Sequence, residues 1–303
     1  MIFENFHQVI RAVREKGRCR VCVASADDVT VLGAVRDARK EDFVDFTLVG
    51  HEERIWRLAI KAGLNLQGID IIDVAEPLLA VERAVREVGK GACDVLMKGM
   101  VNSADFLHAV LSPEGGLRTS RILSHVAVLE VSGYYRLIFI TDGGLNVSPD
   151  YDQKTAIVRN AIQFLHSIGI ETPKVAFLSA NEKVSPKVPS TLEAQKFVQA
   201  AARGEFPGCL LAGPLGLDAA VNEDAAIRKE IDSPVAGRAD LLVVPGIEAG
   251  NMLAKSIVYF AQGRMAGLVL GAAKPVILTS RNEPAYGKLA SIALAALSVV
   301  GKK

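Results

Sequence analysis

Short apolar segments alternate with amphipathic segments of helical length along most of the chain, and this alternation constrains the fold most strongly. The apolar segments resemble buried strands, whereas the segments between them repeat apolar residues at helical spacing. Strands and helices that alternate in this way form a parallel, doubly wound α/β sheet with right-handed crossovers. The expected strands are 19–24, 46–49, 69–74, 94–97, 175–178, 209–211, 241–244, 268–270 and 276–278, and the expected helices are 29–39, 52–62, 77–88, 103–111, 153–166, 192–202, 223–231 and 249–261.

The number of expected strands predicts two lobes. Nine or more strands exceed what one open sheet comfortably holds, so we expect two doubly wound α/β lobes with a cleft between them. Residues 126–131 and 135–140 are two further strand-like segments separated by three residues, which predicts a β-hairpin beside the hinge. We predict a first lobe of residues 1–124 plus 273–303 and a second lobe of residues 125–272, which includes this central hairpin.

Charge and hydropathy limit the partners of the chain. Lys and Arg number 35 against 34 Asp and Glu in 303 residues, so no global field favours nucleic acid or an acidic membrane surface. No apolar run approaches the roughly 20 residues that span a bilayer, and the first residues form an amphipathic pattern without a cleavage site. We therefore expect a cytoplasmic protein that binds neither nucleic acid nor membranes.

The four cysteines include a C-x-x-C spacing, which is typical of redox and zinc sites. Cys19 and Cys22 fall in the first expected strand, where side chains three residues apart point to opposite faces. Cys93 and Cys209 precede apolar strand-like segments, in which a free cysteine behaves as a small hydrophobic residue. We expect buried free thiols, and the sequence shows no His/Cys cluster that predicts a metal site.

Residues 275–289, PVILTSRNEPAYGKL, contain the first candidate for chemistry. An apolar strand stops at Ser280 and Arg281, and Glu283 follows. In open α/β sheets, ligands bind outside the carboxyl ends of the strands. A hydroxyl, a guanidinium fork suited to phosphate and a carboxylate that accepts a proton stand there within four residues. The alternative interpretation is a solvated loop with an N-capping serine.

A second polar segment follows the expected hairpin. Asp142, Gly143 and Gly144 come directly after a buried strand, and Asn146 leads into the next helix. Two consecutive glycines allow the main chain to approach a ligand closely, and an asparagine donates and accepts without charge. The alternative interpretation is a turn followed by a capped helix.

Five strings of the sequence together closely resemble the phosphate acetyltransferase and phosphate butyryltransferase family. They are long, ungapped and in the family's order, and the butyryltransferase side is the closer match. The strings are DVLMKG at 94–99, GYYRLIFITDGGLNVSPDYDQKTAIVRNAI at 133–162, AGPLGLDAAV at 212–221, SPVAGRADLLVVPGIEAGNMLAK at 233–255 and PVILTSRNEPAYGKLASIALA at 275–295.

The resemblance implies an acyltransferase that reversibly moves a short acyl group, such as butyryl, between coenzyme A and phosphate by direct thiolate attack in a ternary complex. It also implies a two-lobed fold similar to isocitrate and isopropylmalate dehydrogenases, with the active site in the interlobe cleft. Coenzyme A is then a substrate, and no permanently bound cofactor or metal is implied. The expected associations are a homodimer or higher homo-oligomer, with the central hairpin as a contact, and a metabolic pairing with an acyl kinase.

The family's Ser-Arg pair corresponds to Ser280 and Arg281, which implies ligands of the phosphate and of the oxyanion. Glu283 stands where butyryltransferase-like members usually have Asp, and it is the candidate base that forms the thiolate. A structural role at a helix start is the alternative for Glu283. Asp142 is a second candidate base. Acetyltransferase relatives place their catalytic Asp at the position of Gly287.

The other strings imply substrate-binding residues at strand exits and at helix starts, where free amides receive anions. Lys98 is expected to meet phosphate groups of coenzyme A, with a solvated helix-cap lysine as the alternative. Gly213 and Pro214 are expected at another strand exit. The predicted substrate-binding residues are Lys98, Gly99, Ser103, Gly143, Gly144, Asn146, Gly213, Pro214, Glu248, Gly250 and Asn251.

Departures from the family pattern at Glu283, Gly246 and Ala219 leave other functions open. Gly246 stands where the family usually has Asp, and Gly216 and Ala219 are smaller than the usual Ala and Asn, which predicts an altered acyl pocket. A non-catalytic or weakly active paralogue that binds acyl-CoA or acyl phosphate is one alternative. A related-fold nicotinamide-dependent dehydrogenase is the other, and it would need a cluster of metal-binding aspartates that the sequence does not show.

Overall fold

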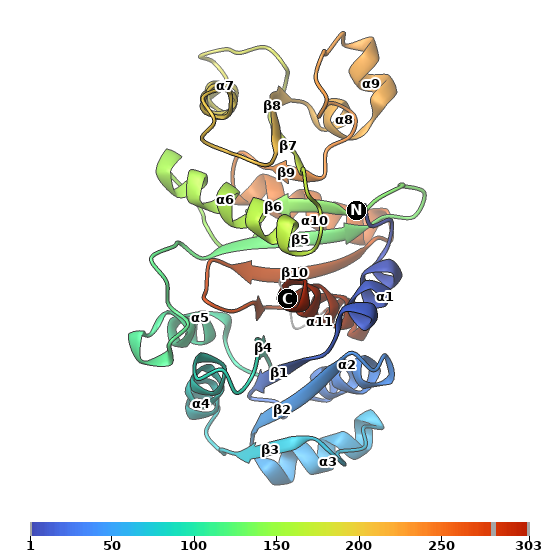
Figure 1. Ribbon diagram of the computed structural model, residues 1–303, viewed down its shortest axis with the longest axis vertical. Helices are drawn as coiled ribbons and strands as arrows, with labels where there is room; N and C mark the ends of the chain where they lie inside the picture. The colour runs from blue at the N-terminus through green and yellow to red at the C-terminus, as the bar shows by residue number, and fades with distance from the viewer. Residues whose placement is uncertain (1, 280–282, 302–303) are drawn as a thin grey trace. The chain divides into compact units, whose positions relative to one another are not determined.

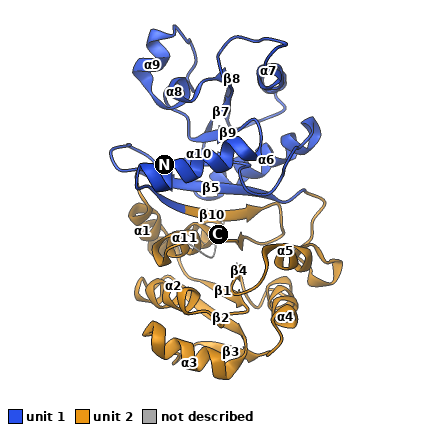
Figure 2. Cartoon of the chain, turned by 180° about the vertical axis from the view of Figure 1, so that it is seen from behind, with its two compact units in different colours: residues 1–4, 122–265 blue, residues 5–121, 266–303 orange. Residues whose placement is uncertain are grey.

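The chain divides into two compact units (Figure 2). Unit 1 comprises residues 1–4 and 122–265, and unit 2 comprises residues 5–121 and 266–303. The structure is a computed structural model that describes residues 2–279 and 283–301. No helix in these described ranges is both long enough and apolar enough to cross a membrane.

Unit 2 is built on a mostly parallel sheet in the order β3-β2-β1-β4-β11-β10. The pairs β1–β2, β1–β4, β2–β3 and β4–β11 are parallel, whereas β10 runs antiparallel to β11. Helices α4 and α5 cover one face of this sheet, and α2, α3 and α11 cover the other (Figure 1). The strands are β1 (Cys19–Ala24), β2 (Val44–Gly50), β3 (Asp70–Asp73), β4 (Val95–Lys98), β10 (Arg264–Leu270) and β11 (Val276–Ile277). The helices are α1 (Phe6–Lys16), α2 (Val29–Lys40), α3 (Glu52–Ala62), α4 (Pro77–Gly89), α5 (Ser103–Leu111), the 3-10 turn η1 (Pro113–Gly115) and α11 (Ala285–Val300).

Unit 1 has the strand order β5-β6-β9-β7-β8. Strands β5 and β6 form the predicted antiparallel hairpin, in which Val126 pairs with Thr141 and Leu129 with Ile138. The remaining pairs are parallel. The strands are β5 (Ser124–Glu130), β6 (Ile138–Thr141), β7 (Lys174–Leu178), β8 (Leu210–Leu215) and β9 (Leu241–Val243). The helices are α6 (Tyr151–Ser167), α7 (Pro189–Ala202), α8 (Leu217–Val221), α9 (Glu223–Arg228) and α10 (Ile247–Phe260).

The predicted doubly wound α/β fold is confirmed, and the largest correction concerns β8. The sequence predicts a strand at 209–211 because Gly213 and Pro214 normally break strands. Strand β8 instead runs on to Leu215, so Gly213 and Pro214 lie inside it and not at its exit. The register between β7 and β8 shifts after Ala176. Ala176 pairs with Ala212 and Leu178 pairs with Leu215, so β8 has one residue more than β7 in this stretch, as in a β-bulge.

Three of the four free cysteines are buried as predicted, namely Cys19, Cys22 and Cys93, whereas Cys209 is half-buried. The Cys93 thiol donates a hydrogen bond to Thr47 Oγ1 at 3.6 Å. Burial raises the pKa of Cys209 to about 11, so this thiol stays protonated near neutral pH.

Helix α11 packs against α1, α2 and the strands β1 and β11 of unit 2. Thirteen of its sixteen residues are buried, including nearly every residue from Gly287 to Val300. A helix that is apolar on all sides is stable only when it is covered on all sides. Its start at Ala285 fixes the position of Glu283, which lies two residues earlier, after β11.

Candidate functional site

In unit 1, Asp142 follows β6 directly and organises the turn that contains the two glycines. Its Oδ1 accepts hydrogen bonds from the Gly144 and Leu145 N–H groups, both at 2.9 Å. Its Oδ2 accepts from the His125 N–H at 3.0 Å and from Asn146 Nδ2 at 2.6 Å. The side chain is 6% exposed. Both carboxylate oxygens are therefore engaged, which favours a structural role for Asp142 over that of the proton acceptor.

Asn146 belongs to the same network. Besides Asp142 Oδ2, its Nδ2 group donates to the main-chain oxygen of Leu123 at 2.9 Å. The amide thus ties the turn after β6 to the segment that leads into β5. As with Asp142, these contacts support the interpretation of a well-made turn, and a contact of Asn146 with substrate remains a prediction.

The DGG turn packs against the start of α10 through two glycines. A Cβ at Gly143 would lie 2.7 Å from the Gly250 carbonyl carbon, and a Cβ at Gly250 would lie 2.7 Å from the Gly143 Cα. Asn251 Nδ2 donates to the Gly143 main-chain oxygen at 3.4 Å. Because β6 and β9 are parallel neighbours, the segments that follow them meet at the same edge of the sheet. The structure thus places the family-like segments 133–162 and 233–255 in contact with each other.

Gly144 lies against an imidazole ring. A Cβ at Gly144 would come within 2.8 Å of the His125 ring, so only glycine fits while this histidine keeps its position. Burial lowers the pKa of His125, and the nearby Asp142 carboxylate opposes this effect. The ring is therefore neutral near pH 7, which agrees with a packing role.

Glu248 and Gly246 lie at the start of α10. Glu248 is exposed in the first turn, and Gly246 is the N-cap, in extended conformation and without a side-chain cap. Gly213 and Pro214 lie farther along the sheet in β8, where a Cβ at Gly213 would lie 2.8 Å from the Phe177 Cβ. Close packing of two strands is thus sufficient to account for Gly213.

In unit 2, Lys98 ends β4 and is buried, with 5% of its surface exposed. Its ammonium donates to the main-chain oxygens of Gly99 at 3.3 Å and Val101 at 2.9 Å. The interpretation of Lys98 as a solvated helix-cap lysine is therefore wrong, because the chain folds back over the ammonium directly after the strand. Contact of Lys98 with substrate phosphates remains a prediction.

Gly99 and Ser103 follow Lys98. The Gly99 N–H donates to the Ala24 oxygen at 2.8 Å, and a Cβ at Gly99 would lie 2.1 Å from the Ser25 oxygen, so the exits of β1 and β4 pack tightly. Ser103 is exposed at the first position of α5, where Asn102 is the N-cap and accepts from the Ala104 N–H. Its hydroxyl is thus accessible at a helix N-terminus.

Of the three predicted catalytic residues in the segment after β11, Ser280 and Arg281 lie outside the described residues. Glu283 is described and is 7% exposed. It follows β11, the parallel neighbour of β4, so its segment and Lys98 leave the sheet at the same edge. The burial of Glu283 excludes a merely solvated carboxylate.

Lys288 in α11 is a buried polar residue that the sequence did not predict as part of the site. It is 3% exposed, and its Nζ donates to the main-chain oxygen of Glu283. The sequence contains one signal that could have indicated Lys288. It is the one charged residue in the otherwise uncharged α11 sequence AYGKLASIALAALSVV.

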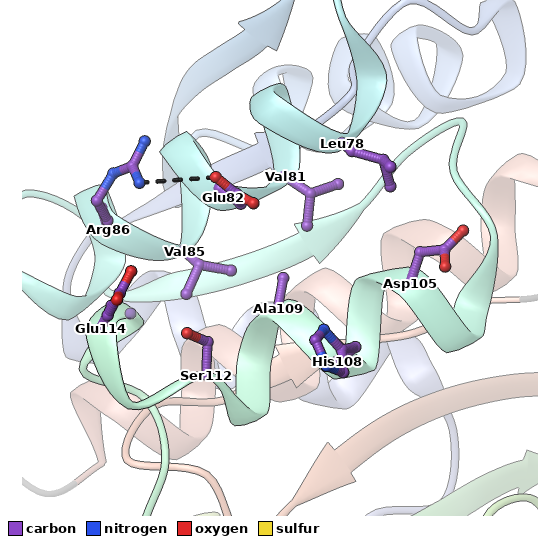
Figure 3. Close-up of a pocket in the computed structure, with 11 residues that line it drawn as sticks. Leu78, Val81, Glu82, Val85, Arg86, Asp105, His108, Ala109, Ser112 and Glu114 are labelled. Atoms are coloured by element: carbon purple, nitrogen blue, oxygen red, sulfur yellow. Dashed lines mark ion pairs between the residues drawn. The ribbon is translucent and has the colours of Figure 1, made fainter.

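A pocket of about 210 Å³ lies elsewhere in unit 2, between α4, α5 and η1 (Figure 3). Val81, Val85 and Ala109 form its apolar wall, and Arg86 lies 3.8 Å from Glu82 at its rim. None of the predicted site residues lines this pocket. Across the described residues, no group of three or more His, Cys, Asp or Glu side chains is placed to hold a metal ion.

Polar residues at the carboxyl ends of parallel strands, in two α/β units, are typical of an α/β enzyme. The family described as phosphate acetyl/butaryl transferase matches residues 77–296. The phosphate butyryltransferase of Clostridium acetobutylicum is 42% identical over 302 residues, which cover 100% of both chains. The phosphate acetyltransferase of Rhizobium meliloti is 41% identical over 96% of this chain and 92% of its own length.

A solved structure gives the same result. The branched-chain phosphotransacylase from Enterococcus faecalis V583 superposes with a TM-score of 0.84 at 30% identity, over 93% of this chain and 99% of that chain. The chain belongs to the phosphate acetyltransferase and phosphate butyryltransferase family, as its sequence strings predict, and it is an acyltransferase. This membership favours acyl transfer over the nicotinamide-dependent alternative.

Proposed function

We propose that this acyltransferase converts short-chain acyl-CoA and phosphate reversibly into acyl phosphate and free coenzyme A. The observation that carries the proposal is the 42% identity to a phosphate butyryltransferase over 100% of both chains. Coenzyme A is a substrate in this reaction, and the proposal includes no permanently bound cofactor or metal.

The proposed mechanism is a direct transfer in a ternary complex. In the direction of thioester formation, a base takes the proton from the coenzyme A thiol, and the sulfur attacks the carbonyl carbon of the acyl phosphate. The C–S bond forms, the bond between the carbonyl carbon and the phosphate oxygen breaks, and phosphate leaves. Glu283 is the proposed base, and Arg281 and Ser280 are the proposed donors to phosphate and to the oxyanion.

Several described residues support this assignment within their own units. In unit 2, the buried Lys98 ends β4 and the buried Glu283 follows β11, the parallel neighbour of β4. In unit 1, the turn after β6 presents main-chain groups beside the N-terminus of α10, where free amides favour an anion. We propose that the predicted lobes, 1–124 plus 273–303 and 125–272, are the substrate-binding lobes.

The experiment that tests the proposal is an assay of thiol release from acyl-CoA in the presence and absence of phosphate. We expect phosphate-dependent release, with butyryl-CoA and branched acyl-CoA used better than acetyl-CoA. Glu283→Gln and Arg281→Ala should each reduce the rate. The proposed function is wrong if no acyl-CoA releases its thiol when phosphate is present, and the proposed site is wrong if both variants keep the full rate.

A homo-oligomer is the proposed assembly, with α10 of unit 1 as its contact. Of the fourteen residues in α10 only Gly250 and Ala254 are buried, whereas Met252, Tyr259 and Phe260 are 64%, 72% and 89% exposed. Exposed apolar groups of this kind mark an interaction surface. This surface, Met252, Tyr259 and Phe260, is better supported as the contact than the central hairpin.

A second copy of this chain is the occupant that we propose for the α10 surface. An aromatic side chain buries roughly 150–250 Å² at an interface. Tyr259 and Phe260 from two copies would therefore bury roughly 600–1,000 Å², about half of the total area of a standard stable interface. Met252 and the neighbouring half-buried residues of α10 would add to this area.

The proposal also includes a cytoplasmic location and a metabolic pairing with an acyl kinase. The reaction yields an acyl phosphate, which is a high-energy mixed anhydride, and an enzyme that transfers its phosphate to a nucleoside diphosphate would consume it. Neither nucleic acid nor membrane binding is part of the proposal, in agreement with the near balance of 35 basic and 34 acidic residues.

A further inference from the structure

Lys288 is the one charged residue in α11, and it lies in the first turns of that helix. Two physical effects oppose a lysine at this place. Burial removes water from the ammonium, which costs several kcal/mol unless other groups compensate. The positive end of the helix dipole also disfavours a cation near a helix N-terminus. A methionine or leucine at position 288 would avoid both costs, so packing alone does not explain the lysine.

Lys288 makes a hydrogen bond to Glu283. Its Nζ donates to the main-chain oxygen of Glu283, five residues earlier in the chain. Lys288 and Glu283 are both buried residues, at 3% and 7% exposure. Pro284 is the N-cap of α11 and makes no side-chain hydrogen bond to the helix. The hydrogen bond from Lys288 to the Glu283 oxygen therefore stabilises the turn that precedes α11.

Among the described residues, the carboxylates of Glu283 and Asp28 act on the ammonium. Burial lowers the pKa of Lys288, and the carboxylates of Glu283 and Asp28 oppose this effect. Asp28 is the N-cap of α2, and its Oδ1 already accepts from the Thr30 and Val31 N–H groups. From α1, His7 faces the neighbouring Tyr286 ring at a centroid distance of 5.9 Å, and the two residues of β11 are apolar. Among the described residues, Glu283 is thus the stronger counter-charge of Lys288, ahead of Asp28.

We propose that Lys288 is a positioning residue of the acyl transfer: its ammonium fixes the main chain at Glu283 and keeps the Glu283 carboxylate in its charged, proton-accepting form. This inference rests on the proposed function, in which Glu283 is the base. A carboxylate that loses water on burial is otherwise driven toward its protonated, inactive form. A nearby ammonium opposes that effect, because opposite charges favour each other's ionised state.

The test is the pH profile of kcat/KM for acyl transfer in Lys288→Met, Lys288→Gln and Lys288→Arg. In Lys288→Met we expect kcat to fall about 10- to 100-fold with a KM for coenzyme A changed less than threefold, and the acid limb to move to higher pH. Lys288→Gln keeps a hydrogen-bond donor for the Glu283 oxygen but lacks the charge. The acid limb of its pH profile should therefore move to higher pH as in Lys288→Met, with a smaller loss of kcat. Lys288→Arg keeps the charge and should return the limb toward its original pH.

Lys154→Met is the matched control, because Lys154 is also a buried lysine, 4% exposed, whose ammonium lies 2.5 Å from Glu193 and 2.9 Å from the Pro245 oxygen in unit 1. We expect this variant to leave the acid limb where it is. If Lys288→Met does not fold, Lys288→Gln makes the same measurement of the limb.

The inference is overturned if the acid limb stays in place in Lys288→Met or Lys288→Gln, since a purely structural lysine would lower the rate without moving the limb. It is also overturned if Glu283→Gln keeps an active enzyme with an unchanged limb, because Glu283 is then not the base although acyl transfer stands. Failure of the proposed function looks different, since the unmodified chain would then show no phosphate-dependent thiol release.

Discussion

Gly143 and Gly250 are glycines for the same physical reason, which is that their main chains touch and neither position has room for a Cβ. The contact joins two polar segments that stand 108 residues apart, counted from Gly143 to Asn251. Gly246, only four residues before Gly250, has room for a Cβ, because the nearest atom would be Glu248 Oε2 at 3.5 Å, an ordinary van der Waals contact. Neighbouring glycines in one string therefore differ in their tolerance of a side chain.

Gly250→Ala should lower the free energy of unfolding by about 1–3 kcal/mol, the usual cost of an overpacked contact, because its Cβ would overlap Gly143 and Val244. Gly246→Asp is the matched change, since an aspartate fits at this N-cap and accepts from the free amides of α10. It should raise the stability by a few tenths to about 1 kcal/mol. Urea denaturation of both variants measures this, and equal effects of the two changes would contradict the packing argument.

His125 should make the stability depend on pH. Burial lowers its pKa in the folded state below the ordinary 6.5, so the unfolded chain binds more protons between the two pKa values. The free energy of unfolding should therefore fall as the pH drops below about 6.5, by at most about 1.4 kcal/mol per pH unit for this one group. His125→Gln should show a shallower fall in urea denaturation at pH 5 to 7. The same slope in both proteins would show that other groups dominate.

At the scale of elements, α10 and α11 present opposite cases of an apolar helix. Each has few charged residues, but α11 is buried over thirteen of its sixteen residues and α10 over only two of its fourteen. The sequence predicts a helix at 249–261, which corresponds to α10, but none over residues 285–300, where α11 lies, and it does not tell that α10 stays uncovered. Burial of α11 follows from its place against α1, α2 and the strands of unit 2.

The α10 surface should control self-association. Tyr259→Glu combined with Phe260→Glu places charges on the proposed contact, and we expect the molar mass measured by light scattering to fall to that of one chain. Ile60→Glu is the control, because Ile60 is 79% exposed on α3 and lies outside the α10 surface. An unchanged mass in the double variant, or a single-chain mass in the unmodified protein, would refute the proposed contact.

For some elements, the local sequence pattern predicts the first and the last residue correctly. Strand β1 and helices α3 and α5 have the predicted bounds, since apolar periodicity and capping residues define them locally. The bounds of β8 were missed, because a glycine and a proline end a strand by local rules, whereas pairing with β7 carries the strand past them. The hairpin was predicted, but its connecting loop is longer than three residues.

At the scale of the whole molecule, the family membership predicts that substrates stabilise the fold. A ligand that binds only the folded chain adds about 2.7 kcal/mol when its free concentration is 100 times its Kd. Coenzyme A at that excess should raise the free energy of unfolding by about this amount, and phosphate should add a separate increment. Arg281→Ala should lose most of the phosphate increment and keep that of coenzyme A. Equal losses of both would refute the assignment of Arg281 to phosphate.

The roles of the candidate site residues remain predictions, but the fold shows the surroundings of several of them. The sequence marks Asp142 and Asn146 as candidates, and only the fold shows that Asn146 donates to Asp142 at 2.6 Å and that the two residues hold the turn. Lys288 was missed because lysine is ordinarily exposed, and a sequence rule assigns it to the surface. The roles of Ser280 and Arg281 remain predictions.

The sequence by itself determined the doubly wound α/β fold, the hairpin and the family, because periodicity and ungapped strings are local properties of the chain. Only the tertiary structure decided that Gly143 and Gly250 touch, that Lys98 is covered and that Lys288 is buried beside Glu283. These features depend on which segments meet after folding. Burial changes the charge and the packing of a side chain, and no local pattern of residues specifies it.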